Sequence, residues 1–316
     1  MKNLHNLINK ALQLHEEGKL QDAIILYSEI LQIQNNDPQL LFMLGTAYVQ
    51  TGRIELGIEN LKKSILIKPD NAFSHSNLGN ALKELKRYDE ALDSYDKAIQ
   101  INSNYSDAYN NKGNTLKELN RYDEALASYD KAIQINPYFV DSYNNKGNAL
   151  KDLKRFDEAL ANYKNVIKFK SDFDYILGKV LHTSMILCSW KEFDLLNEKI
   201  IDALNKKLRV IDPFFFLGLV DNPAFSKLTS EIFVEDKIPK HSEIEPLAKY
   251  NNHKKPRIGY FSADFYDHAV LHLMMDVFKN HDKSNFEILA FSHGPLNKEK
   301  DPWRKIVKPH FDGFYE

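Results

Sequence analysis

Cysteine is almost absent from this chain of 316 residues. The single cysteine, Cys188, excludes an internal disulfide framework and any zinc site built from several cysteines, and it fits a reducing compartment. A charge excess is also absent, because 42 basic residues face 44 acidic ones. This balance argues against a nucleic-acid partner, since no surplus of Lys and Arg is available to neutralise phosphates. No stretch approaches the ~18 consecutive apolar residues of a membrane span. We therefore expect a cytoplasmic protein with no membrane partner.

Enough apolar material is present for a packed core, because 43% of the residues are hydrophobic and 12% are aromatic. The segment 1–18 places its apolar side chains at helical spacing, whereas a secretory signal needs one unbroken apolar run. Asparagine is also abundant, which AT-rich codon usage alone would explain. A recurring asparagine therefore needs a second argument before it is given a function.

The chain contains an internal tandem repeat. Residues 106–139 and 140–173 align without gaps and share 19 identical positions. The same frame extends backwards through residues 72–105, 38–71 and 4–37. Five repeats are therefore predicted over residues 4–173.

Each repeat has the pattern of two helices that pack closely. A glycine recurs in the first half of the repeat, at Gly79, Gly113 and Gly147, and an alanine recurs in the second half. Asp-Glu pairs begin the second half of the last three repeats, where negative charge favours the positive end of a helix dipole. This pattern resembles the tetratricopeptide repeat, a helix–turn–helix unit of about 34 residues. The resemblance implies a right-handed α-solenoid whose concave face is lined by the first helix of each pair.

Asparagine recurs at the sixth position of the repeat, and Met43 is the exception. The residues of this predicted ladder are Asn9, Asn77, Asn111 and Asn145. Amides that project into the groove of a solenoid can donate to and accept from the backbone of an extended peptide. The alternative is an asparagine-rich composition copied by duplication of the repeat. We favour the ladder, so the expected partners are acceptor proteins or peptides in the groove.

After residue 173 the repeat decays into a helical transition segment and a linker, residues 174–254. Helical periodicity continues to about residue 205 and returns near residues 224–233, and three prolines follow between residues 239 and 256. Cys188 has apolar neighbours and no evident basic partner, so we expect a buried structural cysteine rather than a reactive thiol. Trp190 is expected in the core.

From Lys255 the pattern changes to alternating short strands and a helix. Residues 257–261 and 286–291 predict strands, and residues 270–279 predict the helix between them. Strand–helix–strand is typical of a parallel, Rossmann-like sheet, in which ligands bind beyond the carboxyl ends of the strands. That edge is here the loop from Ser262 to His268, which also contains Asp264. Neither a GxGxxG nor a GxxxxGK[ST] motif is present, so no classical dinucleotide or P-loop site is expected.

Two histidines at the end of this loop, His268 and His272, have the spacing i and i+4. We expect no metal here, because a third ligand and the glutamate of an HExxH motif are lacking. His268 is a candidate general base, since histidine titrates near neutrality. From the loop alone, a role for His268 in capping the helix is at least as well supported. His272 is expected to pack or to support the active-site loop.

The C-terminal residues resemble the start of the catalytic region of protein O-GlcNAc transferases and the related SPINDLY proteins. The residues that carry this resemblance are Lys255-Pro256-Arg257-Ile258-Gly259-Tyr260-Phe261-Ser262-Ala263-Asp264-Phe265, His268, Leu273-Met274 and Phe286-Glu287. The resemblance implies a two-lobed GT-B glycosyltransferase that moves N-acetylglucosamine from UDP-GlcNAc to Ser or Thr of proteins bound by the repeats. In that family the histidine matching His268 lies in the active site. The animal enzymes have proline after it, where this chain has Ala269.

The predicted fold is therefore mainly α: a solenoid over 4–173, a transition segment over 174–254, and an incomplete catalytic lobe over 255–316. The family binds its nucleotide sugar mainly through a second lobe that has no counterpart here, so we assign no donor-site residues and expect no sugar transfer by this chain alone. UDP-GlcNAc is the expected donor substrate, and no cofactor is expected. The alternatives are a non-catalytic scaffold for protein partners and a SPINDLY-like protein O-fucosyltransferase.

Overall fold

The computed structural model describes residues 2–237, 255–266, 268–293 and 302–315. The chain divides into two compact units, Met1–Pro239 and Lys240–Glu316. The first unit is helical and the second contains a small parallel sheet, so the predicted mainly α fold with an α/β segment at its C-terminal end is confirmed. The finer division of the chain at residues 173 and 254 remains a prediction.

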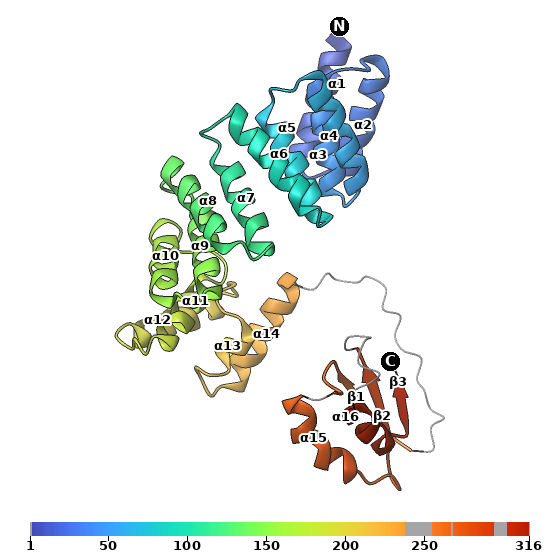
Figure 1. The fold of residues 1–316 in the computed structure, drawn as a ribbon, viewed down its shortest axis with the longest axis vertical. Coiled ribbons are helices and arrows are strands. Elements are labelled where there is room, and N and C mark those ends of the chain that lie inside the picture. The colour runs from blue at the N-terminus through green and yellow to red at the C-terminus, as the bar shows by residue number, and fades with distance from the viewer. Residues whose placement is uncertain (1, 238–254, 267, 294–301, 316) are drawn as a thin grey trace. The chain divides into compact units, whose positions relative to one another are not determined.

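Ten helices form five antiparallel pairs in the first unit, and each pair packs against the next (Figure 1). The first helices of the pairs are α1 (Lys2–Glu16), α3 (Pro38–Gln50), α5 (Ala72–Glu84), α7 (Ser106–Glu118) and α9 (Val140–Asp152). The second helices are α2 (Leu20–Ile33), α4 (Ile54–Ile67), α6 (Tyr88–Ile101), α8 (Tyr122–Ile135) and α10 (Phe156–Phe169).

Two residues after each first helix ends, one residue lies in the left-handed region of backbone space, and it occupies the same position in every repeat. The residues are Gly18, Gly52, Lys86, Asn120 and Lys154, with φ between 58° and 78°. A left-handed residue reverses the chain directly after a helix and so allows a short turn into the second helix of the pair. At the opposite end, the side chains of Asp37 and Asn71 accept hydrogen bonds from backbone amides and cap α3 and α5.

The two helices of a pair meet at a small residue and a large one. Tyr95, Tyr129 and Tyr163 are fully buried, and each ring lies directly over the glycine of the preceding helix. A Cβ atom built on Gly113 would lie 2.6 Å from the ring of Tyr129. Glycine is therefore needed here for the close approach of two helices, as the repeat pattern predicts.

The transition segment contains α11 (Ile176–Ile186), α12 (Phe193–Asn205), α13 (Pro213–Phe216) and α14 (Pro223–Lys237). Helix α11 packs on α10 and so extends the array by one more first helix. Two expectations for this segment are wrong. Cys188 is exposed because it is the left-handed residue that ends α11, and Trp190 is 55% exposed, with its ring edge against Phe193.

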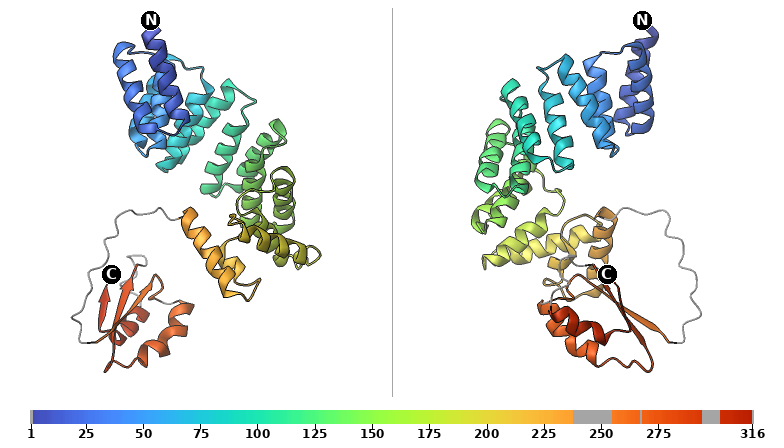
Figure 2. Two further views of the ribbon diagram at one scale, coloured as in Figure 1. Left: turned by 180° about the vertical axis from the view of Figure 1, so that it is seen from behind. Right: turned by 45° about the vertical axis from the view of Figure 1, so that its right-hand side comes forward.

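The second unit has three parallel strands in the order β1-β2-β3. They are β1 (Arg257–Ser262), β2 (Glu287–Ser292) and β3 (Gly313–Tyr315), and α15 (Ala269–Lys279) connects the first two. Helix α16 (Pro302–Val307) and the 3₁₀ turn η2 (Lys308–His310) precede β3. Figure 2 shows the helices of this unit against the sheet, and Phe265, Phe278 and Phe311 lie in the core between them. The expected parallel pairing of the first two strands is confirmed, in the register Arg257 to Glu287.

Most of the expected linker, residues 238–254, lies outside the described residues. Among the helices that are described, none combines the length and the apolar character needed to cross a bilayer.

Candidate functional site

The predicted asparagine ladder lies on the first helices of four pairs. Asn77, Asn111 and Asn145 are half-buried on α5, α7 and α9, three helices that contact one another in turn, whereas Asn9 is exposed on α1. Two of these amides bridge neighbouring repeats. The Nδ2 of Asn77 donates to Thr46 Oγ1 at 3.0 Å, and the Nδ2 of Asn145 donates to Asn110 Oδ1 at 3.1 Å.

These bonds leave part of the ladder available to a ligand. An amide has two N–H donors and an oxygen with two lone pairs, so one donated bond uses a minority of its capacity. No side-chain hydrogen bond is recorded for Asn111 among the described residues, and Asn9 contacts only His5 of its own helix, at 3.3 Å. In the ladder, Asn77 and Asn145 therefore form hydrogen bonds between repeats, whereas within the described residues Asn9 and Asn111 do not.

A second set of asparagines, three positions further along each first helix, orients the buried tyrosines. The hydroxyls of Tyr95, Tyr129 and Tyr163 donate to the Oδ1 atoms of Asn80, Asn114 and Asn148 at 2.8, 2.8 and 2.9 Å. Burial raises the pKa of each tyrosine well above its ordinary value, so the phenols stay protonated and remain donors. Each of these amide oxygens is thereby held, which turns its NH₂ group away from the tyrosine.

A polar cavity of about 430 Å³ lies beside the two sets of asparagines. It is lined by Asn114 and Asn145, by the lysines Lys83 and Lys117, and by neighbouring residues of α5, α6 and α7. This volume is within the range of ligand-binding clefts in proteins. The lysines were not predicted as site residues, although a signal was present: Lys83, Lys117 and Lys151 occupy the same position in three successive repeats.

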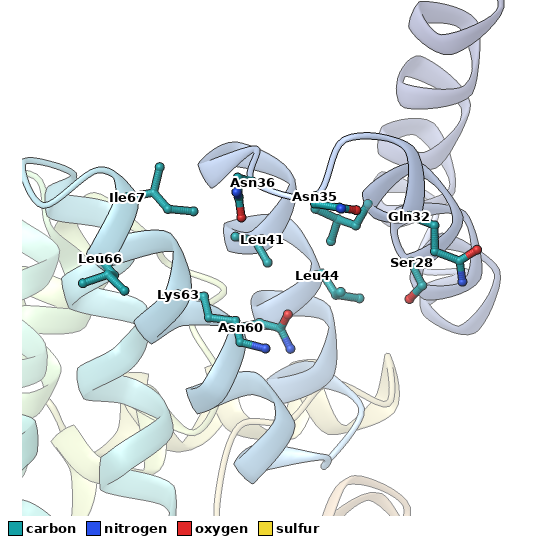
Figure 3. Close-up of a pocket in the computed structure, with 11 residues that line it drawn as sticks. Ser28, Gln32, Asn35, Asn36, Leu41, Leu44, Asn60, Lys63, Leu66 and Ile67 are labelled. Atoms are coloured by element: carbon teal, nitrogen blue, oxygen red, sulfur yellow. The ribbon is translucent and has the colours of Figure 1, made fainter.

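Another cavity, of about 530 Å³, lies in the first two pairs, between α2, α3 and α4. Figure 3 shows Leu41 and Leu44 together with the amides of Asn35, Asn36 and Asn60 around it. None of the predicted ladder residues lines this cavity. Its lining combines aliphatic and polar side chains, and nothing in the repeat pattern predicted it.

In the second unit, Ser262 and Asp264 lie at the carboxyl end of β1. The Oγ of Ser262 accepts a hydrogen bond from the Asp264 amide at 3.0 Å, which fixes the first turn of the loop. Both residues line a cavity of about 220 Å³ whose other walls come from aromatic and aliphatic side chains of β1 and α15. The cavity is at the edge of the sheet where ligands of such folds bind. It is smaller than the usual cleft for a drug-sized ligand.

His268 is the N-cap of α15. Its Nδ1 accepts a hydrogen bond from the Val270 amide at 3.2 Å, and Asp264 Oδ2 lies 3.7 Å from the same nitrogen. Accepting that bond requires an unprotonated Nδ1, so in the neutral ring the proton is on Nε2. In this arrangement Nε2 can donate a hydrogen bond to a ligand but cannot take a proton from one. A role as general base requires His268 to give up the cap.

His272 lies one turn further along α15, where it is exposed and packs edge-on against Trp303, with ring centroids 4.2 Å apart. Its backbone amide donates to the carbonyl of His268. Thus Ser262, Asp264, His268 and His272 all lie around the junction of β1 and α15. Within the described residues no group of three or more His, Cys, Asp or Glu side chains is arranged to hold a metal ion.

Comparison with curated sequences finds a distant relative. The chain is 24% identical over 152 residues to a protein named as a probable UDP-N-acetylglucosamine–peptide N-acetylglucosaminyltransferase SEC of Arabidopsis thaliana. The alignment covers 43% of this chain and only 15% of the plant protein.

Among solved structures, PilF of Pseudomonas aeruginosa is similar in fold, with a TM-score of 0.56, 16% identity, and coverage of 63% of this chain and 90% of that one. MamA matches with a TM-score of 0.47 and 28% identity, over 51% of this chain and 94% of that one.

Family models locate the repeats directly. The model described as "Tetratricopeptide repeat" matches residues 72–105, 106–139 and 140–173, and a second model, "TPR repeat", matches residues 45–86. The three matched ranges have the same boundaries as the third, fourth and fifth predicted repeats. Helix pairs of the same arrangement and the same spacing precede them in the structure. The chain therefore contains an array of tetratricopeptide repeats.

Proposed function

We propose that the repeat array binds extended segments of partner proteins along its first helices. The observation that carries this proposal is the row of half-buried amides on α5, α7 and α9 beside a polar cavity of about 430 Å³. Side-chain amides can pair with the backbone of any extended peptide, so such a row selects for conformation more than for sequence. The asparagines recur at a constant interval along the repeats. An extended peptide backbone also presents its hydrogen-bonding groups at a constant interval, so it suits such a row.

The double variant Asn111→Ala with Asn145→Ala tests this proposal. We expect it to weaken binding of an extended peptide by about tenfold, which corresponds to ~1.4 kcal/mol for two lost hydrogen bonds. The array should stay folded, because buried Asn110 keeps its hydrogen bond from Ser142 Oγ when Asn145 is truncated. Binding is measured by fluorescence anisotropy and folding by circular dichroism.

The matched control is Asn162→Ala on the second helix α10, where the half-buried amide donates only to a carbonyl of its own helix. This variant should bind as the unchanged protein does. Equal affinity of the double variant and the control would remove the ladder from the proposal.

A second candidate function is favoured by the α/β unit. We propose that it belongs to a glycosyltransferase of the O-GlcNAc transferase type, which would take N-acetylglucosamine from UDP-GlcNAc to Ser or Thr of a protein held by the repeats. The support is the likeness to the Arabidopsis protein together with the grouping of Ser262, Asp264 and His268 after β1, at the edge where parallel sheets of this kind bind their ligands. A SPINDLY-like transferase would bind a GDP-fucose donor at the same edge of the sheet. A scaffold without catalysis would use the repeats alone.

Two substitutions at His268 separate a chemical role from a capping role. Asparagine is a good N-cap and cannot act as a base near neutrality, whereas alanine supplies neither property, and loss of a cap costs about 1 kcal/mol of stability. If His268 has a chemical role, His268→Asn and His268→Ala both lose transfer, although only the alanine variant loses stability. If His268 is only a cap, the asparagine variant keeps its transfer activity.

The protein is expressed from its natural gene. Transfer to protein acceptors is then measured with radiolabelled UDP-GlcNAc or GDP-fucose as the donor. Incorporation from one donor identifies the sugar. Absence of incorporation from both donors, with peptide binding retained, would contradict the transferase proposal and support the scaffold.

A further inference from the structure

The cavity of about 530 Å³ between α2, α3 and α4 has a counterpart further along the array. This second cavity has a volume of about 620 Å³, and each residue that lines it lies two repeat intervals beyond a residue of the first cavity. Its lining residues are Ser103, Asn104, Tyr109, Lys131, Gln134 and Ile135. The two cavities therefore occupy the same place in the repeat, and they differ in the side chains that line them.

The first cavity is the more aliphatic of the two. Leu41 and Leu66 line it at the positions where the second cavity has Tyr109 and Gln134. Leu66 is 85% exposed, so the packing of the array does not require a leucine there. Every other repeat has a polar residue at this position, namely Gln32, Gln100, Gln134 and Lys168. Leu66 is thus an exposed leucine at a position that is otherwise polar.

Leu66 is continuous with a larger aliphatic surface. In Figure 3, Leu66 on α4 lies on one side of the cavity and Gln32 on α2 lies on the other, with Leu41 and Leu44 of α3 between them. Leu41 and Leu44 are buried, whereas Leu66 is exposed, so the aliphatic lining extends from the core to the solvent. An exposed apolar surface of this kind, surrounded by polar residues, is typical of an interaction site.

The polar groups of this cavity provide acceptors and no unpaired charge. The Oγ of Ser28 donates to the carbonyl of Ile24, and the Nδ2 of Asn60 donates to the carbonyl of Leu56, both at 2.8 Å. Ser28 has thereby used its donor, and within the described residues no hydrogen bond is recorded to the Oδ1 of Asn60, so both oxygens can accept from a ligand.

The charge in the lining is already compensated. Lys63 lines the cavity, and its Nζ lies 2.7 Å from a carboxylate oxygen of Glu59, one turn earlier on α4. A charged ligand would lose hydration here without meeting an unpaired opposite charge. The cavity therefore favours an uncharged ligand that brings hydrogen-bond donors and an aliphatic group.

We propose that this cavity binds an uncharged segment of a partner protein. A branched aliphatic side chain of that segment packs against Leu41, Leu44 and Leu66, and its backbone N–H groups donate to Ser28 and Asn60. A peptide supplies both features at once, because each side chain is attached next to a backbone amide. The cavity shares no residue with the asparagine ladder, so it is a second binding surface that does not depend on the first.

The probe for this site is the capped peptide acetyl-Ser-Gly-Ser-Leu-Ser-Gly-Ser-amide, titrated into protein with ¹³C-labelled leucine and isoleucine methyl groups. Binding should shift the NMR signals of Leu41, Leu44 and Ile67, which line the cavity. A peptide with Glu in place of Leu should bind at least about tenfold more weakly, because it loses the aliphatic contact and adds a charge. Methylation of the leucine backbone nitrogen should also weaken binding, since it removes an N–H donor.

The variant Leu66→Gln gives α4 the residue that two later repeats have at this position. It should stay folded, because Leu66 is exposed, and it should bind the leucine peptide about tenfold more weakly. The matched control is Leu195→Gln on α12, which replaces a leucine that is 54% exposed and does not line the cavity. This control should bind normally. The double variant Asn111→Ala with Asn145→Ala should also keep the methyl shifts at this site.

Three outcomes would overturn the inference. The first is equal affinity of Leu66→Gln and Leu195→Gln for the leucine peptide. The second is equal affinity of the unchanged protein for the leucine, glutamate and N-methylated peptides. The third is a shift of the same methyl signals with protein concentration alone, which would assign the cavity to a second copy of this chain. All three leave the proposed ladder intact, because no ladder residue contributes to this cavity.

Discussion

At the scale of single residues, three side chains form one unit that recurs in each of three repeats. Gly113 allows the ring of Tyr129 to lie against the backbone of α7, and the hydroxyl of that tyrosine holds the amide of Asn114 at 2.8 Å. The same arrangement recurs in the repeats directly before and after. A packing requirement in the core thus sets the orientation of an amide next to the candidate ligand cavity.

The substitution Gly113→Ala should destabilise the array by up to about 2 kcal/mol. Overpacking of a core costs about 1–3 kcal/mol, and the better helix propensity of alanine returns at most about 1 kcal/mol. The ring of Tyr129 is fully buried and cannot move aside. Chemical denaturation measures the change in the free energy of unfolding.

A double-mutant cycle shows whether contact with the Tyr129 ring causes this loss of stability. In a Tyr129→Leu background the alanine should cost markedly less, because the ring that it would contact is gone. The same cost in both backgrounds would contradict this explanation.

At the scale of elements, the left-handed residues set the length of every first helix. The first two are glycines, and the others are Lys86, Asn120, Lys154 and Cys188. A non-glycine residue in this conformation costs about 1–2 kcal/mol, which the rest of the repeat must offset. This also explains why Cys188 could not be predicted as exposed from its apolar neighbours: its environment is set by its place in the repeat.

The substitution Lys154→Gly should therefore stabilise the protein by about 0.5–1 kcal/mol, as the relief of strain exceeds the added entropy of the unfolded chain. The control Lys97→Gly removes the same charge from the interior of α6 and should destabilise by about 1 kcal/mol. Thermal unfolding of both variants measures the difference. A loss of stability at Lys154 comparable to that at Lys97 would show that the left-handed conformation carries no strain.

Most long elements were predictable from sequence, whereas the short ones were not. The repeat helices, α15, β1 and β2 follow from sustained periodicity, and the observed bounds of α15, β1 and β2 differ from the predicted ones only at their terminal residues. Helix α16 and the short strand β3 have too few residues to show a period, and β3 is defined by its pairing with β2. The cap formed by His268 was one of two open alternatives, because a loop histidine reveals its role only through the atoms beside it.

At the scale of the whole molecule, the first unit is a one-dimensional array in which each helix pair contacts mainly its neighbours. Its interior pairs are covered on both sides, whereas α1 is at one end and packs mainly on α2. Local opening of an end helix therefore disrupts fewer contacts than opening of an interior one.

Hydrogen exchange followed by mass spectrometry should show this gradient. Amides of α7 should exchange at least about tenfold more slowly than those of α1, since tenfold corresponds to ~1.4 kcal/mol of opening free energy. Uniform protection from α1 to α7 would mean that the array opens only as a whole.

The sequence by itself determined the period of the repeat, the pairing of helices, the recurring glycines that allow close packing and the parallel order of the first two strands. These features depend on residues that are close in the chain or on a repeated pattern, and both are visible in the sequence itself. Only the tertiary structure decided which amides are already used between repeats and that His268 caps α15. These facts depend on contacts between side chains that are distant in the sequence. Burial and local charge are properties of such contacts rather than of any single residue.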